Sequence, residues 1–435
     1  MLRPKQIMPE KLSDQSIVIL SGVRGDTRRY RTLHLFEQLR LVGINCALSH
    51  LTDPQLPRLL EHAKMVIFHR TPLDGYVDKL LERLRRRGAL VILDVDDLVF
   101  DPAAFQWIDS PDFQDPLRAK LYRAEMERQR EMLDSSQAVL ASTDFLAERV
   151  RNYGKPAWMH RNAFSHEMLE LSEAAYSSRR TNRERIVIGY ASGTPTHDRD
   201  FEVAKPALKH ILQQFPQVQL WLIGSLNPGS NWGRLADQVR RLAWVPWRKL
   251  PELMVQLDIN LAPLVIDNPF AQSKSEIKYM EAALLRLPTV ASPTGAFQTA
   301  IRSGENGFLA NTPAEWAEAL ESLVREQGVR LQVGQRAYEH ALAHYHPSRR
   351  AHELLATLNQ IQESLAGSPL ESAEASHTQY PVQGFRIDPA IERSPSLWRM
   401  ALYSLRHRGI RTLGTQVWIY IRRLLAPVWP YRRSG

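Results

Sequence analysis

Short apolar runs alternate with amphipathic stretches along the first third of the chain. Runs of four or five mostly apolar residues occur at 16–20, 65–68, 89–93 and 138–141. The segments at 33–43, 77–87, 115–134 and 145–153 carry apolar residues at helical spacing or helix-favouring residues. Strands that alternate with helices in this way predict a parallel sheet with helices on its faces.

The same alternation returns in the second half of the chain. Strands are predicted at 186–190, 218–223, 258–262 and 288–291, and helices at 202–215, 250–257, 275–287 and 313–327. A chain of 435 residues also exceeds the usual size of one hydrophobic core. We therefore predict two successive α/β domains.

The boundaries of these domains follow from changes in composition. The segment 166–185 is polar without a sheet period, and the segment 366–390 is rich in small and polar residues. The predicted organisation is an N-terminal domain at 1–165, a linker at 166–185, a C-terminal domain at 186–340, terminal helices at 341–365 that can cross back to the N-terminal domain, a flexible spacer at 366–390 and a basic amphipathic tail at 391–435.

Positive charge is concentrated in the tail. The whole chain has a formal net charge of +9, and residues 391–435 contain nine arginines against one acid, Glu392. Aromatic residues such as Trp398, Trp418 and Trp429 lie between the arginines. Basic segments with aromatic and aliphatic faces bind anionic membrane surfaces, which is the interpretation favoured here. Nucleic-acid binding, which is not expected, and packing of the tail on the protein itself are the alternatives.

The remaining composition bears on the cellular compartment. Cys46 is the one cysteine of the chain, which excludes an internal disulfide and a cysteine-based zinc cluster. The polar segment 1–12 lacks the apolar core of a signal peptide, and no run of 18 uncharged apolar residues occurs. A cytoplasmic protein, peripheral at the inner face of the cell membrane, is expected.

Three charged residues have the spacing of one helix face. Lys274, Lys278 and Glu281 stand at i, i+4 and i+7 in a helix predicted to open near Ser275. Two ammonium groups and the N–H groups at a helix start suit a diphosphate, and a carboxylate two turns on suits ribose hydroxyls. The alternative is a solvated face with a Lys278–Glu281 pair, which contributes only a few tenths of a kcal/mol.

The sequence contains the string Lys-Ser-x-x-Lys-x-x-Glu at 274–281. Together with the segments 257–264, 287–292 and 304–309, this string resembles the retaining family 4 glycosyltransferases, formerly called group 1. The likeness extends over most of residues 16–360. It implies a GT-B fold, in which two Rossmann-like domains face each other across a cleft. Glu281 matches the second glutamate of the family's Glu-x7-Glu motif, and Ser273 replaces the first, as in a recognisable sub-group.

The resemblance assigns the nucleotide-sugar donor to the C-terminal domain, with no metal and no cofactor. The loop after the strand 186–190 borders the ligand cleft in such a domain. The predicted donor-binding residues are Gly193, Thr194, His197, Arg199, Lys274, Ser275, Lys278 and Glu281. His197 either contacts phosphate or stabilises the loop, and Asp198 or Asp200 is expected to cap the following helix.

Residues of the N-terminal domain are predicted to form the acceptor side of the cleft. Gly22, at the first strand-to-helix turn, would permit close approach, and Arg28 or Arg31 would meet an anionic acceptor, unless these arginines are merely solvated. The Asp94-Val-Asp-Asp97 string contains an Asp-x-Asp pattern, which suggests a metal site. We reject the metal site and expect these carboxylates to bind acceptor hydroxyls, with one of them acting as a base. Crowding should raise the pKa of at least one of these carboxylates. The acceptor-side residues are Gly22, Arg28, Arg31, Arg70 and Asp94, and the predicted catalytic residues are His69, Asp96, Asp97 and Lys278, with a purely structural role the alternative for His69.

The resemblance implies transfer of a sugar, with retention of configuration, from a nucleotide-sugar to a glycan or lipid-linked acceptor. Assembly of a bacterial surface polysaccharide or lipopolysaccharide is the expected setting. Two alternatives remain open. A nucleotide-sugar epimerase shares the architecture, and a non-catalytic nucleotide-sugar-binding protein would accommodate the departures at Ser273 and in the phosphate loop.

Overall fold

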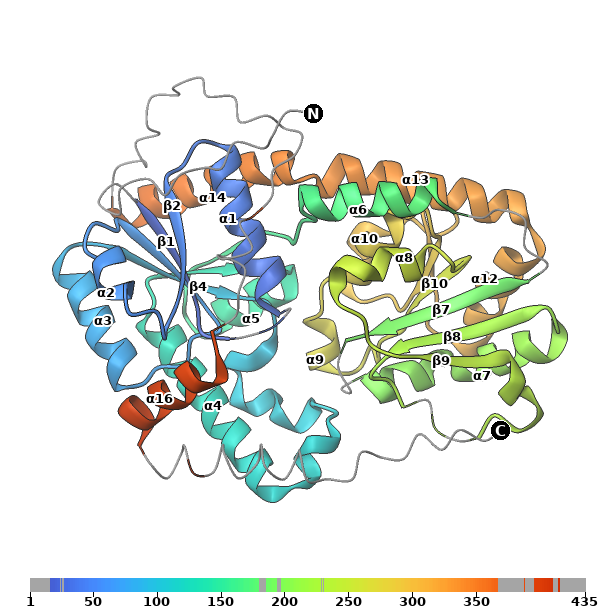
Figure 1. Cartoon of the computed structure of the whole chain (residues 1–435), viewed down its shortest axis with the longest axis horizontal. Coiled ribbons are helices and arrows are strands. Elements are labelled where there is room, and N and C mark those ends of the chain that lie inside the picture. The colour runs from blue at the N-terminus through green and yellow to red at the C-terminus, as the bar shows by residue number, and fades with distance from the viewer. Residues whose placement is uncertain are drawn as a thin grey trace.

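The computed structural model describes residues 16–23, 25, 27–179, 185–193, 197–227, 229, 231–366, 387, 395–409 and 414. Two six-stranded parallel sheets, each packed between helices, lie beside one another (Figure 1). This arrangement confirms the predicted α/β fold with two Rossmann-like domains.

The first sheet has the strand order β2-β1-β3-β4-β5-β6. Its strands are β1 (Ile17–Ser21), β2 (Cys46–His50), β3 (Met65–His69), β4 (Leu90–Val95), β5 (Ala138–Ala141) and β6 (Ala157–Met159). Alternate residues of these strands point to opposite faces, and both faces are apolar, as expected of a parallel sheet covered on both sides. One face packs against α2 (Leu56–Leu59), α3 (Gly75–Arg86), α4 (Pro116–Ser135) and α5 (Asp144–Asn152).

The second sheet has the strand order β12-β11-β10-β7-β8-β9. Its strands are β7 (Ile186–Ser192), β8 (Val218–Gly224), β9 (Val239–Leu242), β10 (Ile259–Ala262), β11 (Thr289–Ala291) and β12 (Phe308–Leu309). One face packs on α7 (Asp198–Gln214) and α12 (Pro313–Arg325), and the other packs on α8 (Leu250–Met254) and α10 (Ile277–Ala283).

Short helices fill the connections between these elements. They are η2 (Arg29–Leu33), η3 (Leu98–Phe100), η4 (Pro102–Trp107), η5 (Pro111–Gln114), η7 (Gly233–Gln238), η8 (Trp247–Lys249), α9 (Pro269–Gln272) and α11 (Gly295–Ala300). In both sheets the chain changes direction next to the first strand, between β1 and β3 and between β7 and β10. Ligands of doubly wound domains bind outside the carboxyl ends of the strands at such points.

Two long helical segments join the domains. Much of the predicted linker 166–185 is the helix α6 (His166–Ser177). The helix α13 (Gln327–Tyr345) follows the second sheet, and α14 (Pro347–Ala366) returns to the first domain, where it packs beside α1 (His34–Leu41). Leu354, Leu358 and Ile361 of α14 are fully buried there, so the last part of the globular chain completes the core of the first domain.

The described part of the basic tail lies on the N-terminal domain. The helix α16 (Leu397–Arg408) packs against α3 (Figure 1). Tyr403 donates a hydrogen bond of 2.9 Å to Asp74, and Arg408 pairs with the same carboxylate at 3.1 Å. Most of the spacer 366–390 and the rest of the tail lie outside the described residues.

A single buried glycine lets α13 approach the turn between α10 and β11. A Cβ atom at Gly334 would lie 2.1 Å from the carbonyl oxygen of Arg286. Arg286 itself has a φ of +54°, an uncommon conformation for a residue other than glycine. The close approach therefore requires glycine at position 334.

Gly334→Ala should lower the free energy of unfolding by ~1–3 kcal/mol, because the added methyl group overpacks a rigid contact. Thermal unfolding followed by circular dichroism measures this effect. Gly328→Ala, in the first turn of the same helix where a Cβ meets nothing within 4 Å, should be neutral or stabilising by up to ~1 kcal/mol. Equal melting temperatures for the two variants would contradict the packing described here.

Candidate active site in the cleft between the domains

Side chains from both sheets meet across the cleft at the carboxyl ends of the strands. Lys274 pairs with Asp97 at 2.8 Å, and Asn162 donates a hydrogen bond of 2.8 Å to the hydroxyl of Ser275. Each contact joins the segment between α9 and α10 to the N-terminal domain. The structure therefore places two predicted donor-binding residues, Lys274 and Ser275, against the N-terminal domain, where Lys274 meets the predicted catalytic residue Asp97.

Lys278 is partly buried beside the end of β7. Its ammonium group donates a short hydrogen bond to the carbonyl of Ala191 and lies 4.8 Å from the ring centroid of Tyr190. Burial lowers the pKa of Lys278 to about 8, while the carboxylates of Glu281 and Asp200 act in the opposite direction. Lys278 is thus a cation that loses its charge in mildly alkaline solution.

The predicted single helix face at 274–281 is wrong in its geometry. α9 ends at Gln272 and α10 begins at Ile277, so Lys274 and Ser275 lie in a break between two short helices. Lys274 nevertheless lies near enough to Lys278 to lower its pKa. The two cations are close because the chain turns, and the helical spacing that predicted their proximity does not apply.

The start of α10 also lacks the phosphate-binding features expected of it. Its N-cap is Glu276, a buried residue whose carboxylate accepts a hydrogen bond of 2.9 Å from Tyr345. An acid at this position opposes the binding of an anion to the first N–H groups of the helix. In this segment, Lys274 and Lys278 supply positive charge that is complementary to a diphosphate.

Ser273 is buried and turns toward the N-terminal domain. Its hydroxyl donates to Asp97 at 3.0 Å and also lies 2.7 Å from the carbonyl of Phe270. The hydroxyl at this position of the motif thus meets a carboxylate from the opposite domain.

The loop between β7 and α7 is held by two aspartates. Asp200 accepts from the Val265 N–H at 3.0 Å and bonds to the His197 ring at 2.9 Å, and Asp198 accepts from the Asn227 N–H at 2.8 Å. Neither aspartate caps α7, contrary to the prediction, because both lie within its first turn and the N-cap position is His197. Burial lowers the pKa of His197 against the opposing effect of Asp200.

The other predicted residues of this loop differ in position. Gly193 is exposed at the end of β7, and Arg199 is exposed at the start of α7. The backbone N–H of Arg199 donates to Asp109 of the N-terminal domain at 3.2 Å. Thr194 lies outside the described residues.

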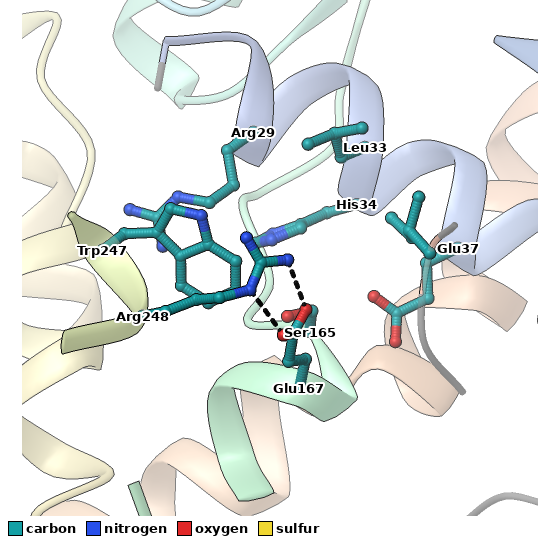
Figure 2. Close-up of a pocket in the computed structure, with 9 residues that line it drawn as sticks. Arg29, Leu33, His34, Glu37, Ser165, Glu167, Trp247 and Arg248 are labelled. Carbon is teal, nitrogen blue, oxygen red and sulfur yellow. Dashed lines mark hydrogen bonds and ion pairs between the residues drawn. The ribbon is translucent and has the colours of Figure 1, made fainter. Parts of the chain in front are cut away.

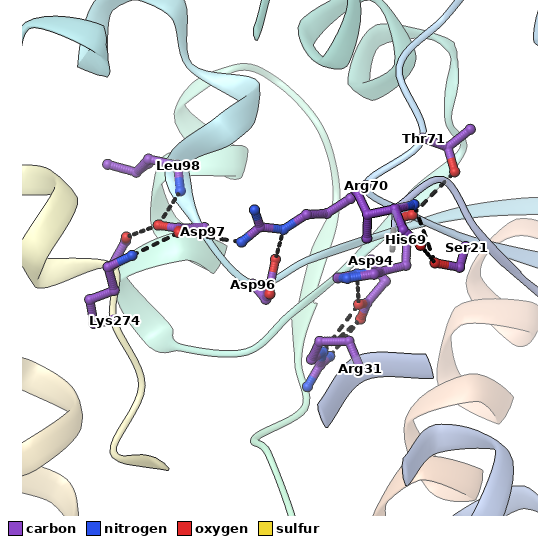
Figure 3. A network of polar contacts seen from close by, with 12 residues as sticks. Ser21, Arg31, His69, Arg70, Thr71, Asp94, Asp96, Asp97, Leu98 and Lys274 are labelled. Carbon is purple, nitrogen blue, oxygen red and sulfur yellow. Dashed lines mark hydrogen bonds and ion pairs between the residues drawn. The ribbon is translucent and has the colours of Figure 1, made fainter. Parts of the chain in front are cut away.

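On the acceptor side, Arg31, His69 and Asp94 form a closed network (Figure 3). Asp94 accepts from the Arg31 Nε at 3.1 Å and bonds to the His69 Nδ1 at 2.9 Å, and all three residues are at most 1% exposed. Arg31 also donates to the His160 carbonyl at 2.8 Å and to Asn162 at 3.1 Å. The expected contact of Arg31 and Asp94 with an acceptor is not available in this arrangement, because they satisfy each other beneath the surface.

A second group of charges lies nearer the cleft. Arg70 donates to Asp96 at 2.7 Å and to Asp97 at 3.3 Å (Figure 3). Asp97 in turn pairs with Lys274 of the other domain. Asp96 and Asp97, predicted as catalytic, thus lie in the cleft with a cation on each side of Asp97.

The predicted rise in a carboxylate pKa is wrong for Asp94 and Asp96. Burial alone would raise the pKa of each, but the Arg31 guanidinium holds the pKa of Asp94 below its usual value, and Arg70 does so for Asp96. The same pairing raises the pKa of Arg70 against the effect of its burial. Neighbouring arginines therefore outweigh the crowding of the carboxylates.

The strand ends β1 and β3 approach each other closely at Gly22. A Cβ at Gly22 would lie 2.3 Å from the carbonyl oxygen of Arg70, and Arg70 has a φ of +45°. A non-glycine residue in this region of φ is strained, and such strain concentrates at functional sites. Gly22 thus leaves room for the backbone of Arg70, at the place where an acceptor was predicted. Arg28, another predicted acceptor-side residue, is only 3% exposed.

Glu281 interacts with two residues that the sequence did not single out. Tyr30 donates a short hydrogen bond to Glu281 Oε1, and the Arg29 Nη2 lies 3.3 Å from the same oxygen. The three residues come from segments about 250 positions apart, and both Arg29 and Tyr30 are mostly buried. Only their place in the predicted first strand-to-helix turn hinted at a role.

A pocket opens between η2, α1, α6 and η8, near Arg29 (Figure 2). Arg29, Leu33, His34 and Glu37 line it from the N-terminal domain, and Trp247 and Arg248 line it from the C-terminal domain. Burial and the nearby Arg29 lower the pKa of His34 to about 3, so this ring is neutral. A second pocket shares Arg29 and Trp247 and reaches Glu281, with Leu250, Met254, Leu284 and Leu285 among its lining residues.

The described residues contain neither a cluster suited to a metal ion nor a membrane-spanning helix. They contain no group of three or more histidine, cysteine, aspartate or glutamate residues arranged to hold a metal ion. Within the same residues, no helix combines the length and apolar character needed to span a bilayer.

Solved structures share this fold. Sucrose-phosphate synthase from Thermosynechococcus elongatus is 14% identical, with a TM-score of 0.55 over 80% of this chain and 100% of that chain. HepE from Anabaena, solved in complex with UDP, is 15% identical, with a TM-score of 0.52 and the same coverage. These likenesses support the GT-B fold.

A family model matches the second domain. The family model described as "Glycosyl transferases group 1" matches residues 185–326. Curated relatives include the D-inositol 3-phosphate glycosyltransferases of Corynebacterium jeikeium, 30% identical over 155 residues (32% of this chain and 36% of the relative), and of Corynebacterium efficiens, 39% identical over 146 residues (31% and 34%). The matched region spans about a third of the length of these relatives. Residues 185–326 thus match the group 1 glycosyl transferases, within a two-domain GT-B fold.

Proposed function

We propose that this protein is a glycosyltransferase that moves a sugar from a nucleotide-sugar, bound by the C-terminal domain, to a glycan or lipid-linked acceptor at the N-terminal domain. The observation that carries the proposal is the grouping of Lys274, Lys278 and Glu281 outside the carboxyl end of β7, within a domain that matches group 1 glycosyl transferases. Two cations and a carboxylate at a switch point of the sheet suit a nucleoside diphosphate.

In this proposal the leaving diphosphate is stabilised by Lys278 and Lys274, which meet the negative charge that develops as the donor bond breaks. Asp96 and Asp97 face the acceptor, with Arg70 fixing their orientation. The catalytic groups are dispersed over both domains, so closure of the cleft assembles them. Retention of configuration, a bacterial surface polysaccharide or lipopolysaccharide as product, and a metal-free reaction follow from the family resemblance and are part of the proposal.

The deciding experiment measures thermal shifts with a panel of nucleotide-sugars, followed by release of nucleoside diphosphate with and without candidate acceptors. Release that depends on an acceptor supports transfer. Interconversion of the free nucleotide-sugar would favour an epimerase, and binding without turnover would favour a non-catalytic binding protein. No stabilisation by any nucleotide would contradict the proposal.

Glu281→Ala should weaken nucleoside diphosphate binding by about 10- to 100-fold, because hydrogen bonds from ribose hydroxyls to a charged acceptor are lost. Isothermal titration calorimetry measures the dissociation constant. Glu318→Ala removes an exposed acid of the same domain and serves as the control, with unchanged affinity. Equal affinities for the two variants would mean that Glu281 does not hold the ribose.

Nucleoside diphosphate affinity should fall above about pH 8, by roughly tenfold per pH unit, since Lys278 has a pKa of about 8 and its neutral amine cannot pair with phosphate. Lys278→Arg keeps its charge throughout this range, so its affinity should stay nearly constant. Calorimetric titrations of both proteins in a pH series test the difference. Parallel curves would show that Lys278 does not control phosphate binding.

The membrane is the proposed location of the acceptor, and α16 carries this part of the proposal. Tyr403 faces the N-terminal domain, while Leu397, Trp398 and Leu405 are 53%, 74% and 40% exposed. The helix contains three arginines and no acid. Exposed apolar side chains next to arginines match an anionic lipid surface, and no nucleic-acid partner is expected.

Trp398→Ala should reduce binding to phosphatidylcholine vesicles that contain phosphatidylglycerol by about tenfold, because an apolar side chain buried in lipid contributes ~1–3 kcal/mol. Co-sedimentation measures the bound fraction. Trp244→Ala, which removes a similarly exposed tryptophan of the C-terminal domain (53%), should have no effect. Equal binding to vesicles without phosphatidylglycerol, or tighter binding to DNA than to vesicles, would contradict this location.

A further inference from the structure

The carboxylate proposed to hold the ribose is already occupied in this structure. Tyr30 donates a short hydrogen bond to Glu281 Oε1, and the guanidinium of Arg29 lies 3.3 Å from the same oxygen. The side chain of Glu281 is 15% exposed. A partly buried carboxylate needs such donors, since an unsatisfied one is costly.

The guanidinium of Arg29 also covers the aromatic surface beside Glu281. It lies 4.8 Å from the ring centroid of Trp247 and 4.4 Å from that of Tyr30. Its Nη1 lies 3.4 Å from the sulfur of Met168. One planar cation thus spans the space between the carboxylate and an indole ring.

The surface continues from Trp247 into an apolar pocket. Leu250, Met254, Leu284 and Leu285 line it next to Glu281. A nucleoside has the matching parts in the matching order, because its ribose carries two hydroxyl donors and its base is a planar group that stacks on aromatic and apolar surfaces. Arg29 and Tyr30 therefore supply, from within the chain, the same two kinds of contact that a nucleoside would make.

We propose that Arg29 and Tyr30 form a latch that competes with the nucleoside part of the donor for Glu281 and Trp247. Ribose hydroxyls replace Tyr30 and Arg29 at the carboxylate, and the base replaces the guanidinium on the indole. Donor entry then breaks a contact between the two domains. This inference rests on the proposed function, because it concerns the same nucleotide site.

The latch couples donor binding to the loss of this contact between the domains. Part of the binding energy of the nucleotide is spent on separating Glu281 from Tyr30, so the observed affinity is lower than the intrinsic affinity of the open site. Removing the competing donor should therefore tighten binding. A residue that contacts the bound nucleotide would have the opposite effect when it is removed.

Titration calorimetry with UDP, ADP and GDP tests the latch. For whichever diphosphate binds the wild-type protein, Tyr30→Phe should lower the dissociation constant by about tenfold, since one charge-assisted hydrogen bond no longer opposes entry. Arg29→Met, which removes the charge and keeps apolar volume, should act in the same direction. Tyr153→Phe removes a comparable hydrogen bond, of 2.8 Å to Asp101 away from the cleft, and should leave the affinity unchanged.

The possible outcomes separate the latch from the proposed function. Unchanged or weaker binding by both Tyr30→Phe and Arg29→Met, with the wild type still binding, would overturn the latch alone. Failure of wild type and variants alike to bind any of the three diphosphates would overturn the nucleotide site and the latch together. Circular dichroism of each variant shows that it is folded, and the two different substitutions guard against a local effect of either.

Discussion

Contacts between opposite charges across the cleft between the two sheets hold the two domains against each other in this structure. Glu281 of the C-terminal domain is held by Arg29 and Tyr30 of the N-terminal domain, and Asp97 of the N-terminal domain is held by Lys274 and Ser273. Each domain thus presents a carboxylate to donors of the other. Because these groups are partly desolvated, breaking such a contact requires new hydrogen-bond donors for the carboxylate, and the ribose hydroxyls of a nucleotide are suited to provide them at Glu281.

Beneath this interface the N-terminal domain supplies a rigid support. Arg31, Asp94 and His69 bond to one another out of contact with solvent, and Arg31 extends the network through Asn162 to Ser275. The network connects the ends of β3 and β4 to the segment that carries Lys274. The Arg31 guanidinium holds the pKa of the Asp94 carboxyl below its usual value, where crowding predicted a rise.

Much of the fold could be predicted because parallel strands are buried on both faces and therefore appear as apolar runs, as 138–141 does for β5. β2 (Cys46–His50) has a serine and a histidine in its second half, and β12 has two residues, so neither gives that signal. Helical spacing gave a wrong geometry for Lys274, because it applies only within an unbroken helix and α10 begins only at Ile277. The pairing of Arg29 with Glu281 joins residues 252 positions apart and leaves no local pattern.

The central claim is that one site at Glu281 serves the nucleotide and the contact between the domains. Hydrogen–deuterium exchange with and without a saturating nucleoside diphosphate tests it directly. The account predicts slower exchange in α10 and at the end of β7, together with faster exchange in η2, where Arg29 and Tyr30 are released. Protection of η2 along with α10, or no change in either segment, would contradict it.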